Sequence, residues 1–333
     1  MNGEMEKISM AHGGGGRASA DLIAAEILPR FGAGPLAGLP DAASLPGGRV
    51  FSTDSFVVSP RFFPGGSIGK LAVCGTVNDI AVAGGVPEFL SLAMIVEEGL
   101  PRAELGRILD DVRDAASLCG VAVATGDTKV VPRGAADGLY LCTAGIGTAD
   151  PAFRLGQKFV KAGDAVIVSG SLGEHGMTIL AARHNIGGDA PASDCAPVLP
   201  QTRAAAAFGA AVRFMRDPTR GGAAAVVSEI AAGADFGIEL AAEALPFSPA
   251  VRTLSGMLGI DPIHAASEGR VVAVVDAAAA DDLVAAWRAL PGGAMAARIG
   301  VVNGEAGQVT LRGAYGARRL LVLPEGDPLP RIC

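Results

Sequence analysis

The sequence contains 333 residues, enough for about two domains that each bury a core. Its net charge is −7 and its 27 lysine and arginine residues are scattered, so we expect no nucleic-acid partner, because such binding depends on clustered basic residues. No uncharged apolar run approaches the ~20 residues that span a bilayer, and the opening MNGEMEKISM lacks the apolar core of a signal peptide. We therefore expect a cytoplasmic protein with no membrane segment.

The first half of the chain shows both helical and strand spacing. The clearest helix follows Pro101, because apolar residues after it repeat along one helical face. Those residues are Leu105, Ile108, Leu109, Val112 and Ala116. The other elements predicted here are helices over residues 18–28 and 67–84 and strands over residues 49–58, 87–98, 121–125 and 138–147.

The composition changes around residues 149–164, which we interpret as a join between domains. The elements predicted after it are helices over residues 174–184, 201–215, 223–232 and one ending at Leu290, and strands over residues 165–170, 271–276, 295–302, 308–312 and 318–324. Strands and helices alternate, with hairpin-like pairs rather than strict βαβ units. The sequence therefore predicts an α+β fold of two mixed α/β domains, residues 1–150 and 151–323, followed by an extended tail over residues 324–333.

Familiar nucleotide and metal motifs are missing. PGGSIGKL resembles a P-loop, but three residues rather than four separate Gly65 from Gly69, and Leu71 replaces the Ser or Thr that binds magnesium. The four histidines are dispersed, which argues against a histidine metal site.

The five cysteines lack CxxC spacing and are odd in number, which argues against a disulfide framework. Cys74, Cys119 and Cys142 stand in apolar contexts and are interpreted as small buried residues, and Cys195 as an inert loop thiol. Cys333 has no such explanation, because it is the last residue of the proline-rich LPEGDPLPRIC.

Four aspartates stand at the ends of predicted elements beside small residues. They are Asp54 in STDSF, Asp79 in VNDIA, Asp127 in GDTKV and Asp217 in RDPTRGG. Magnesium prefers hard oxygen ligands and often bridges carboxylates to substrate phosphates, so a Mg-nucleotide site without a P-loop is one interpretation. Each aspartate taken alone is explained as well by a helix cap or a turn, and spacing does not show that the four converge.

Three more residues have a functional and an ordinary interpretation. Thr219, with Asp217, precedes two glycines and a helix whose N-terminal amides can hold an anion. Lys129 can neutralise phosphate charge or assist a proton transfer, or it is a surface lysine. Glu268, in ASEGR before a strand, is either a candidate base or a solvated turn carboxylate.

Motifs spread over nearly the whole chain carry a resemblance to a known family. They are HGGGG, STDSFVV, NDIAVAGGVP, GDTKVV, SLGEHG, MRDPTRGG, ASEGR and the final PRIC. NDIA and GDTKV alone point to the ATP-binding superfamily of aminoimidazole ribonucleotide synthetase and selenophosphate synthetase. MRDPTRGG together with PRIC resembles, within that superfamily, the HypE family of hydrogenase maturation proteins. One departure is the loop HGGGG, where Gly14 and Gly15 replace a more mixed HGSGG-type pattern.

The resemblance implies a fold in which two N-terminal domains pair in a homodimer and build a sheet barrel across the interface, with ATP in a cleft. The residues that it implies as Mg²⁺ or phosphate ligands are Asp54, Asp79, Asp127 and Asp217. Those that it implies in ATP binding are Gly13, Gly14, Gly15, Gly16, Asn78, Asp79, Asp127 and Thr219, with the glycines as a mobile cover.

The resemblance also implies an enzyme that acts on its own final cysteine. Cys333 would accept a carbamoyl group from a HypF-type carbamoyltransferase, ATP would activate the carboxamide oxygen as a phosphate ester, and loss of phosphate would leave a thiocyanate. The cyanide would pass to iron on a HypC–HypD complex, for the active site of nickel–iron hydrogenase. Lys129 and Glu268 are the candidates for handling charge and protons.

The ten residues from Pro324 would reach roughly 30 Å in polyproline-like form. We therefore expect a Cys333 thiol that is accessible and a tail end that is dispensable for folding, since nothing apolar follows Ile332 to bury it.

Two alternatives stay open. One is another ATP-dependent enzyme of the superfamily that acts on a free small molecule, such as selenophosphate synthetase. The reactive Cys or Sec of that enzyme lies in the N-terminal glycine loop, where this chain has none. The other is a non-catalytic thiol carrier whose ATP site only holds the fold together.

Overall fold

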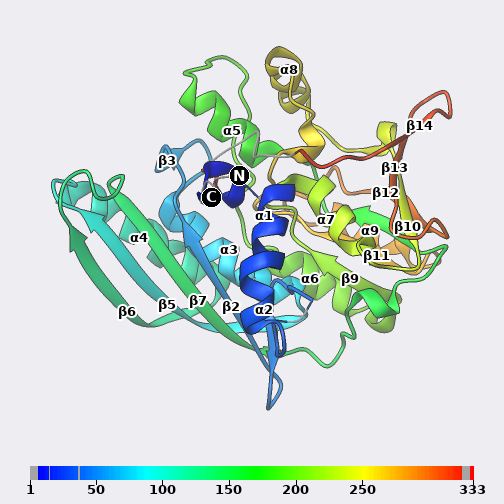
Figure 1. Ribbon diagram of the computed structural model, residues 1–333, viewed down its shortest axis with the longest axis horizontal. Coiled ribbons are helices and arrows are strands. Elements are labelled where there is room, and N and C mark those ends of the chain that lie inside the picture. The colour runs from blue at the N-terminus through cyan, green and yellow to red at the C-terminus, as the bar shows by residue number, and fades with distance from the viewer. Residues whose placement is uncertain (1–6, 15, 37, 325–330) are drawn as a thin grey trace, which may run out of the picture.

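The computed structural model describes residues 7–14, 16–36, 38–324 and 331–333. The chain forms two mixed α/β halves, each built on its own sheet, and helix α3 (Ile68–Val82) lies between them (Figure 1). The predicted mixture of strands and helices is confirmed. In the part of the chain that the structure describes, no helix is long and apolar enough to cross a membrane.

The first half is built on a five-stranded sheet with the order β1-β2-β7-β5-β6, in which only β5 and β6 run parallel. Its strands are β1 (Ala43–Leu45), β2 (Arg49–Phe56), β5 (Gly85–Glu97), β6 (Ala122–Val131) and β7 (Leu139–Ala149). Side chains alternate between the two faces of a strand, so Ser52, Asp54 and Phe56 of β2 all point to the face that α3 covers.

Helices α3 and α4 (Arg102–Cys119) pack against each other on that face. Helix α3 is mostly apolar and is buried almost all round, and it also carries the polar residues Thr76, Asn78 and Asp79. Helix α4 buries one face, on which Ala115 and Cys119 join Ile108 and Val112 of the predicted stripe, and it ends at Gly120 with a left-handed φ of 71°. A Cβ on Gly69 would lie 2.4 Å from the Ile108 carbonyl oxygen, so this glycine permits the close approach of the two helices.

The opposite face of this sheet and its edge strand β6 are open to solvent. Residues 122–130 of β6 are all exposed, and β6 is the last strand in the sheet order. Large apolar side chains are exposed on β5 and β6, namely Val86, Phe89, Ile95, Val123 and Val130. An open edge beside an apolar face is a surface on which another strand can pair.

The second half is built on a seven-stranded sheet with the order β14-β13-β10-β12-β8-β11-β9. Its strands are β8 (Ala165–Val168), β9 (Val212–Arg216), β10 (Gly237–Ala241), β11 (Val272–Val275), β12 (Ala297–Asn303), β13 (Val309–Arg312) and β14 (Arg318–Leu320). Its helices are α5 (Glu174–Arg183), α6 (Leu199–Ala206), α7 (Gly222–Ala231), α8 (Pro249–Leu258) and α9 (Ala280–Arg288). Strands β8 and β11 are buried along their whole length, as uninterrupted apolar runs predict.

Shorter elements complete the chain. They are the 3-10 turns η1 (Met10–Gly13), η3 (Gln157–Phe159), η4 (Gly209–Ala211), η5 (Ala242–Ala244) and η6 (Pro262–His264), helices α1 (Arg17–Leu22) and α2 (Leu28–Phe31), the π-helical turn η2 (Ile23–Ile27) between those two helices, and the hairpin strands β3 (Phe62–Phe63) and β4 (Gly66–Ser67).

Two features of the second half differ from the sequence-based expectation. The predicted helix over residues 201–215 is wrong beyond Ala206, because Val212 and Met215 are buried on strand β9, which pairs with β11. Strand β10 and helix α8 were not predicted.

In the first half, the predicted strand over residues 121–125 continues to Val131, so the GDTKVV motif lies within a strand rather than after one.

Candidate active site

Carboxylates from three distant segments meet close to helix α3. Asp41 precedes β1, Asp79 lies on α3 and Asp217 follows β9, and one oxygen atom of each lies within 4.8 Å of the others. Asp217 is buried and the other two are partly buried. Clustered carboxylate oxygens are the ligands that Mg²⁺ prefers.

Asp54 joins this cluster from strand β2, where its carboxyl lies close enough to Asp79 and Asp217 to raise the pKa of both. The hydroxyl of Thr76 donates to Asp54 Oδ2 at 2.8 Å. The hydroxyl of Ser52 donates to Asp79 Oδ2 at 2.6 Å. Because one partner in each hydrogen bond comes from β2 and the other from α3, the packing of strand on helix fixes both carboxyl groups.

Burial raises the pKa of all four carboxyls above the usual value. The pKa values of Asp79 and Asp217 rise furthest, because repulsion from the neighbouring carboxylates adds to burial. Arg216 offsets part of this at Asp41, where its Nε lies 2.6 Å from Oδ1. Asp217 Oδ2 is buried and has no hydrogen-bond partner among the described residues. A divalent cation would satisfy this oxygen and relieve the repulsion, so the cluster fits Mg²⁺.

Glu268 lies beside the cluster in the loop before β11 and is 1% exposed. Burial and then repulsion from Asp217 raise its pKa well above the usual value, whereas Arg220 lowers it. Its Oε1 is buried without a hydrogen-bond partner in the described structure. These surroundings favour the protonated carboxyl, and positive charge arriving nearby would favour the carboxylate.

Asn78 holds the two halves of the chain together. Its amide nitrogen donates to the carbonyl oxygens of Ala196 at 3.1 Å and Glu268 at 3.2 Å, and its Oδ1 accepts from the Val198 backbone at 2.9 Å. The side-chain amide of Asn78 therefore forms its hydrogen bonds with protein groups, among them the backbone of Glu268.

The glycine-rich segment lies next to the MRDPTRGG motif. Arg220 Nη1 donates to the Gly13 carbonyl oxygen at 3.0 Å, while Gly14 and Gly16 are buried and cap η1 and α1. Gly15 falls outside the described residues. Thr219 is partly buried in the turn between Asp217 and helix α7.

Asp127 and Lys129 lie elsewhere, on the exposed edge strand β6, where they form an ion pair of 2.7 Å. The hydrogen bond from Lys129 lowers the pKa of Asp127. Strand β6 stands three places from β2, or roughly 14 Å at the usual strand spacing. A single copy of the chain therefore does not bring these two residues to the carboxylate cluster.

The last three residues are packed against the fold, which corrects the expectation that nothing buries the tail end. Ile332 is 1% exposed and belongs to the main hydrophobic core, and Cys333 is partly buried against it. The Val57 amide, just after β2, donates to the Cys333 carbonyl oxygen at 3.1 Å. Val57 is three positions along the chain from Asp54, a distance of at most about 10 Å, so the tail end is held beside the strand that carries Asp54.

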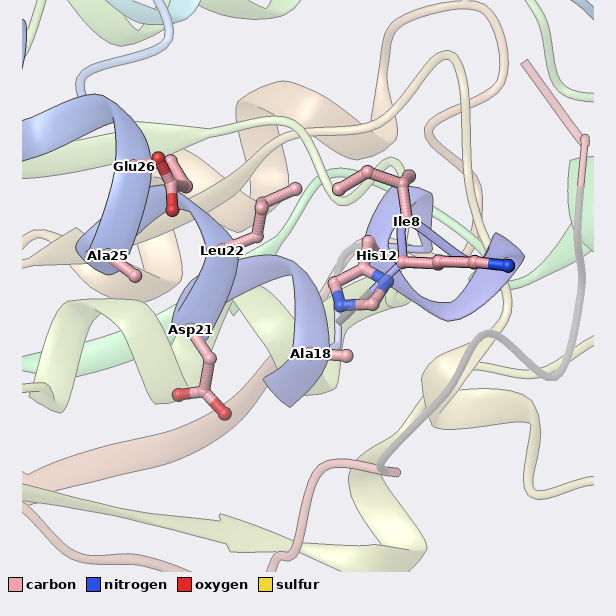
Figure 2. A pocket seen from close by; sticks show the side chains of 8 residues that line it. Ile8, His12, Ala18, Asp21, Leu22, Ala25 and Glu26 are labelled. Carbon is pink, nitrogen blue, oxygen red and sulfur yellow. The ribbon is translucent and has the colours of Figure 1, made fainter. Parts of the chain in front are cut away.

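A surface cavity of about 360 Å³ lies between η1 and α1 (Figure 2). The His12 ring lies between these two elements, Asp21 extends from α1, and Glu26 extends from the adjoining turn η2. None of the clustered carboxylates lines this cavity, so it is separate from the acidic site.

Asp41 is the acidic residue that sequence reasoning missed. It stands in LPDAAS, beside small residues and before a strand, which is the same local signal that singled out the other aspartates. Its convergence with Asp79 and Asp217 is visible only in the fold.

Two family models match most of the chain. They are the AIR synthase related protein N-terminal domain over residues 40–149 and the AIR synthase related protein C-terminal domain over residues 161–312. The fold and its carboxylate site thus define an AIR-synthase-related protein.

Individual relatives narrow this class. The chain is 45% identical to the carbamoyl dehydratase HypE of Escherichia coli strain K12, covering 99% of this chain and 100% of the relative. A crystal structure of a HypE–HypF complex contains a chain that is 40% identical with a TM-score of 0.88, covering 91% of this chain and 99% of that one. A HypE structure in complex with ATP is 39% identical with a TM-score of 0.82, covering 98% and 100%. The chain belongs to the HypE family, which confirms the resemblance carried by its motifs.

Proposed function

We propose that the chain is an ATP-dependent carbamoyl dehydratase, which converts a carbamoyl group on Cys333 into a thiocyanate and so supplies the cyanide ligand of nickel–iron hydrogenase. The observation that carries this proposal is the binding of residues 331–333 beside β2, the strand from which Asp54 enters the carboxylate cluster. Relatives named carbamoyl dehydratase HypE, and a HypE chain in complex with ATP, support it.

Asp41, Asp54, Asp79 and Asp217 would hold Mg²⁺, which when bound neutralises phosphate charge and orients the transferred phosphoryl group. The glycine-rich segment covers the ATP phosphates, and its contact with Arg220 places a cation against them. Thr219 lies in the turn before helix α7, whose first amides are suited to bind phosphate oxygens.

The chemistry balances as a dehydration driven by ATP. The carboxamide oxygen of Cys333–S–CO–NH₂ attacks the γ-phosphorus, the bond to the ADP oxygen breaks, and a phosphate ester forms. The nitrogen loses two protons in all, and cleavage of the C–O bond expels phosphate and leaves Cys333–S–C≡N. Phosphorylation is needed because an amide oxygen is otherwise a poor leaving group.

Glu268 is the group that we assign to remove a nitrogen proton. Burial and repulsion from Asp217 raise its pKa and so favour its protonated form while the site lacks positive charge. Cations that neutralise Asp217 lower that pKa and allow Glu268 to act as a base. Asn78 holds the Glu268 backbone in place for this step.

A second copy of the chain would complete the site. Pairing two copies through β6 would cover the exposed Phe89, Val123 and Val130 and close the two sheets into a barrel. It would also carry Asp127 and Lys129 toward the cluster of the other copy, where Asp127 adds a metal or phosphate ligand and Lys129 neutralises phosphate charge.

Two partners follow from the proposed chemistry. A HypF-type carbamoyltransferase loads the thiol, consistent with the HypE–HypF complex to which this chain is similar. A HypC–HypD complex takes the cyanide onto iron.

The test is mass spectrometry of the peptide that ends at Cys333, after incubation with HypF, carbamoyl phosphate, ATP and Mg²⁺. We expect a carbamoyl adduct that loses one water to become thiocyanate. Asp79→Asn is expected to keep the adduct and stop its conversion, whereas Cys333→Ala is expected to abolish the adduct. A carbamoyl group on Cys142, or conversion without ATP, would reject the proposal.

A further inference from the structure

The last three residues are bound by hydrogen bonds from two segments that lie far away in the sequence. The amides of Val57 and Ser59 donate to the carbonyl oxygens of Cys333 at 3.1 Å and Arg331 at 3.3 Å, so the tail end runs antiparallel to this stretch. From the other side, Arg183 donates to the Arg331 carbonyl oxygen. We call these groups, with His175, the tail seat.

His175 contacts the carbonyl group between those two. Its Nε2 lies 2.6 Å from the Ile332 carbonyl oxygen, and its Nδ1 lies 2.7 Å from the hydroxyl of Ser193. The Cys195 amide in turn donates to that hydroxyl at 3.1 Å. His175 is fully buried, within the SLGEHG motif at the start of helix α5.

These contacts define the tautomer of the ring. A carbonyl oxygen only accepts hydrogen bonds, so Nε2 must carry the proton that it donates to Ile332. Nδ1 is then the acceptor and receives the proton of the Ser193 hydroxyl. Burial, together with a smaller effect of Arg183, lowers the pKa of His175 to about 4 although the bond to the Ile332 carbonyl raises it, so the ring is neutral at pH 7.

The surroundings hold the ring in this position. Phe63 of the β3–β4 hairpin packs edge to face against it, with ring centroids 5.3 Å apart. The Ser193 amide donates to the Pro64 carbonyl oxygen at 2.8 Å. A Cβ on Gly65 would lie 2.6 Å from the Ser193 carbonyl oxygen, and its φ of 93° also favours glycine. The PGG turn, which resembles part of a P-loop, thus packs against the serine that orients His175.

We propose that His175, held by Ser193 as the Nε2–H tautomer, is a positioning residue that binds the Ile332 carbonyl and so holds Cys333 beside the end of strand β2, the strand from which Asp54 enters the carboxylate cluster. The purpose of this contact rests on the proposed function, since a thiol that carries the reacting group must return to one place. The geometry of the contact is independent of that function. His175 acts through the backbone of the tail and touches no reacting atom.

The first experiment measures how readily the tail leaves the seat. Cys333 in the full-length protein is alkylated with iodoacetamide, and its rate is compared by peptide mass spectrometry with that of Cys142, which serves as an internal reference. His175→Leu removes the donor, and we expect the relative rate of Cys333 to rise about five- to tenfold. His175→Gln keeps a nitrogen donor on a side chain of similar reach, and its rate is expected to stay within about twofold of wild type.

The second experiment separates positioning from simple packing. The cost of His175→Leu in melting temperature is measured in the full chain and in a chain without residues 331–333. A residue that acts through the tail loses part of that cost when the tail is absent, whereas a residue that only fills the core has the same cost in both. In single turnovers, His175→Leu should slow the conversion of the carbamoyl group while the KM for ATP stays unchanged.

The two experiments distinguish failure of the seat from failure of the proposed function. The role of His175 would be overturned by equal alkylation rates of Cys333 in wild type and His175→Leu, together with an equal loss of melting temperature in chains with and without residues 331–333. A wild-type protein that forms no thiocyanate, but whose alkylation follows the expected order, would overturn the dehydratase proposal and leave the seat supported.

Discussion

The side chain of Ile332 is the main apolar contribution to binding of the tail end, and truncating it should release the thiol. Ile332 is 1% exposed, and replacing a buried isoleucine by alanine costs about 2–5 kcal/mol. The lower figure applies here, because the final residues can leave without opening a cavity in the rest of the core. The hydrogen bonds to the tail, at about 1 kcal/mol each, are offset by about 1–2 kcal/mol of entropy for each residue ordered. Ile332→Ala should thus weaken docking by about 2 kcal/mol, a factor of about 30.

Alkylation of Cys333 relative to Cys142 measures this change, because a docked thiol is partly buried. We expect the relative rate to rise about ten- to thirtyfold in Ile332→Ala. Val322→Ala is the matched control, since it removes the same kind of side chain from a residue near the start of the tail that is 70% exposed. A relative rate within twofold of wild type in Ile332→Ala would refute the reasoning.

Three further predictions follow from the carboxylate cluster, the β6 edge and the buried histidine. Asp217→Asn relieves repulsion among the clustered carboxylates, so the melting temperature of this variant in metal-free buffer should rise by the equivalent of about 1 kcal/mol. Millimolar Mg²⁺ should stabilise only the wild type, and equal stabilisation of both proteins would contradict the metal site. Co-expressed Asp79→Asn and Asp127→Asn chains should together recover about a quarter of wild-type ATP hydrolysis, because half of the dimers are hybrids with one intact site; no recovery in purified hybrids would contradict completion by a second copy. Burial lowers the pKa of His175 from 6.5 to about 4, so the neutral ring contributes stability that is fully present above pH 6.5 and is lost as the pH falls toward 4. The free energy of unfolding should fall by up to about 3 kcal/mol over this range, and the melting temperature of His175→Gln should fall less than that of the wild type.

Local patterns in the sequence predict those elements whose burial they determine. The stripe on α4 is an example, because the spacing that includes Ile108 and Val112 leaves only one face to bury. The alanine-rich stretch before Val212 favours a helix, and the pairing of β9 with β11 overrides that preference from Val212 onward. Helix α8 carried a readable signal, because Ser248 and Pro249 form an N-cap and first turn.

The site could be predicted in its residue types and not in its convergence. Asp54, Asp79 and Asp217 were identified because carboxylates beside small residues suit a metal–nucleotide site, and the fold brings them together with Asp41. Asp127 carries the same signal, yet one copy of the chain leaves it on an exposed edge. Sequence spacing contains no information on which strands become neighbours, so it could not separate these cases.

The burial of Ile332 gives the tail two opposing requirements. For loading, the thiol must reach a separate carbamoyltransferase. Burial of Ile332 alone makes the docked state about 30-fold more populated, so the apparent affinity of a partner that binds only the undocked tail falls by the same factor. For dehydration, the carbamoyl group must stay at the cluster while phosphate is transferred, and the same docking energy now favours the reaction. Ile332→Ala should therefore be carbamoylated faster than wild type at limiting carbamoyltransferase and converted to thiocyanate more slowly once loaded. A general loss of folding would slow both steps, so the opposite signs of the two changes identify the seat as the element that balances them.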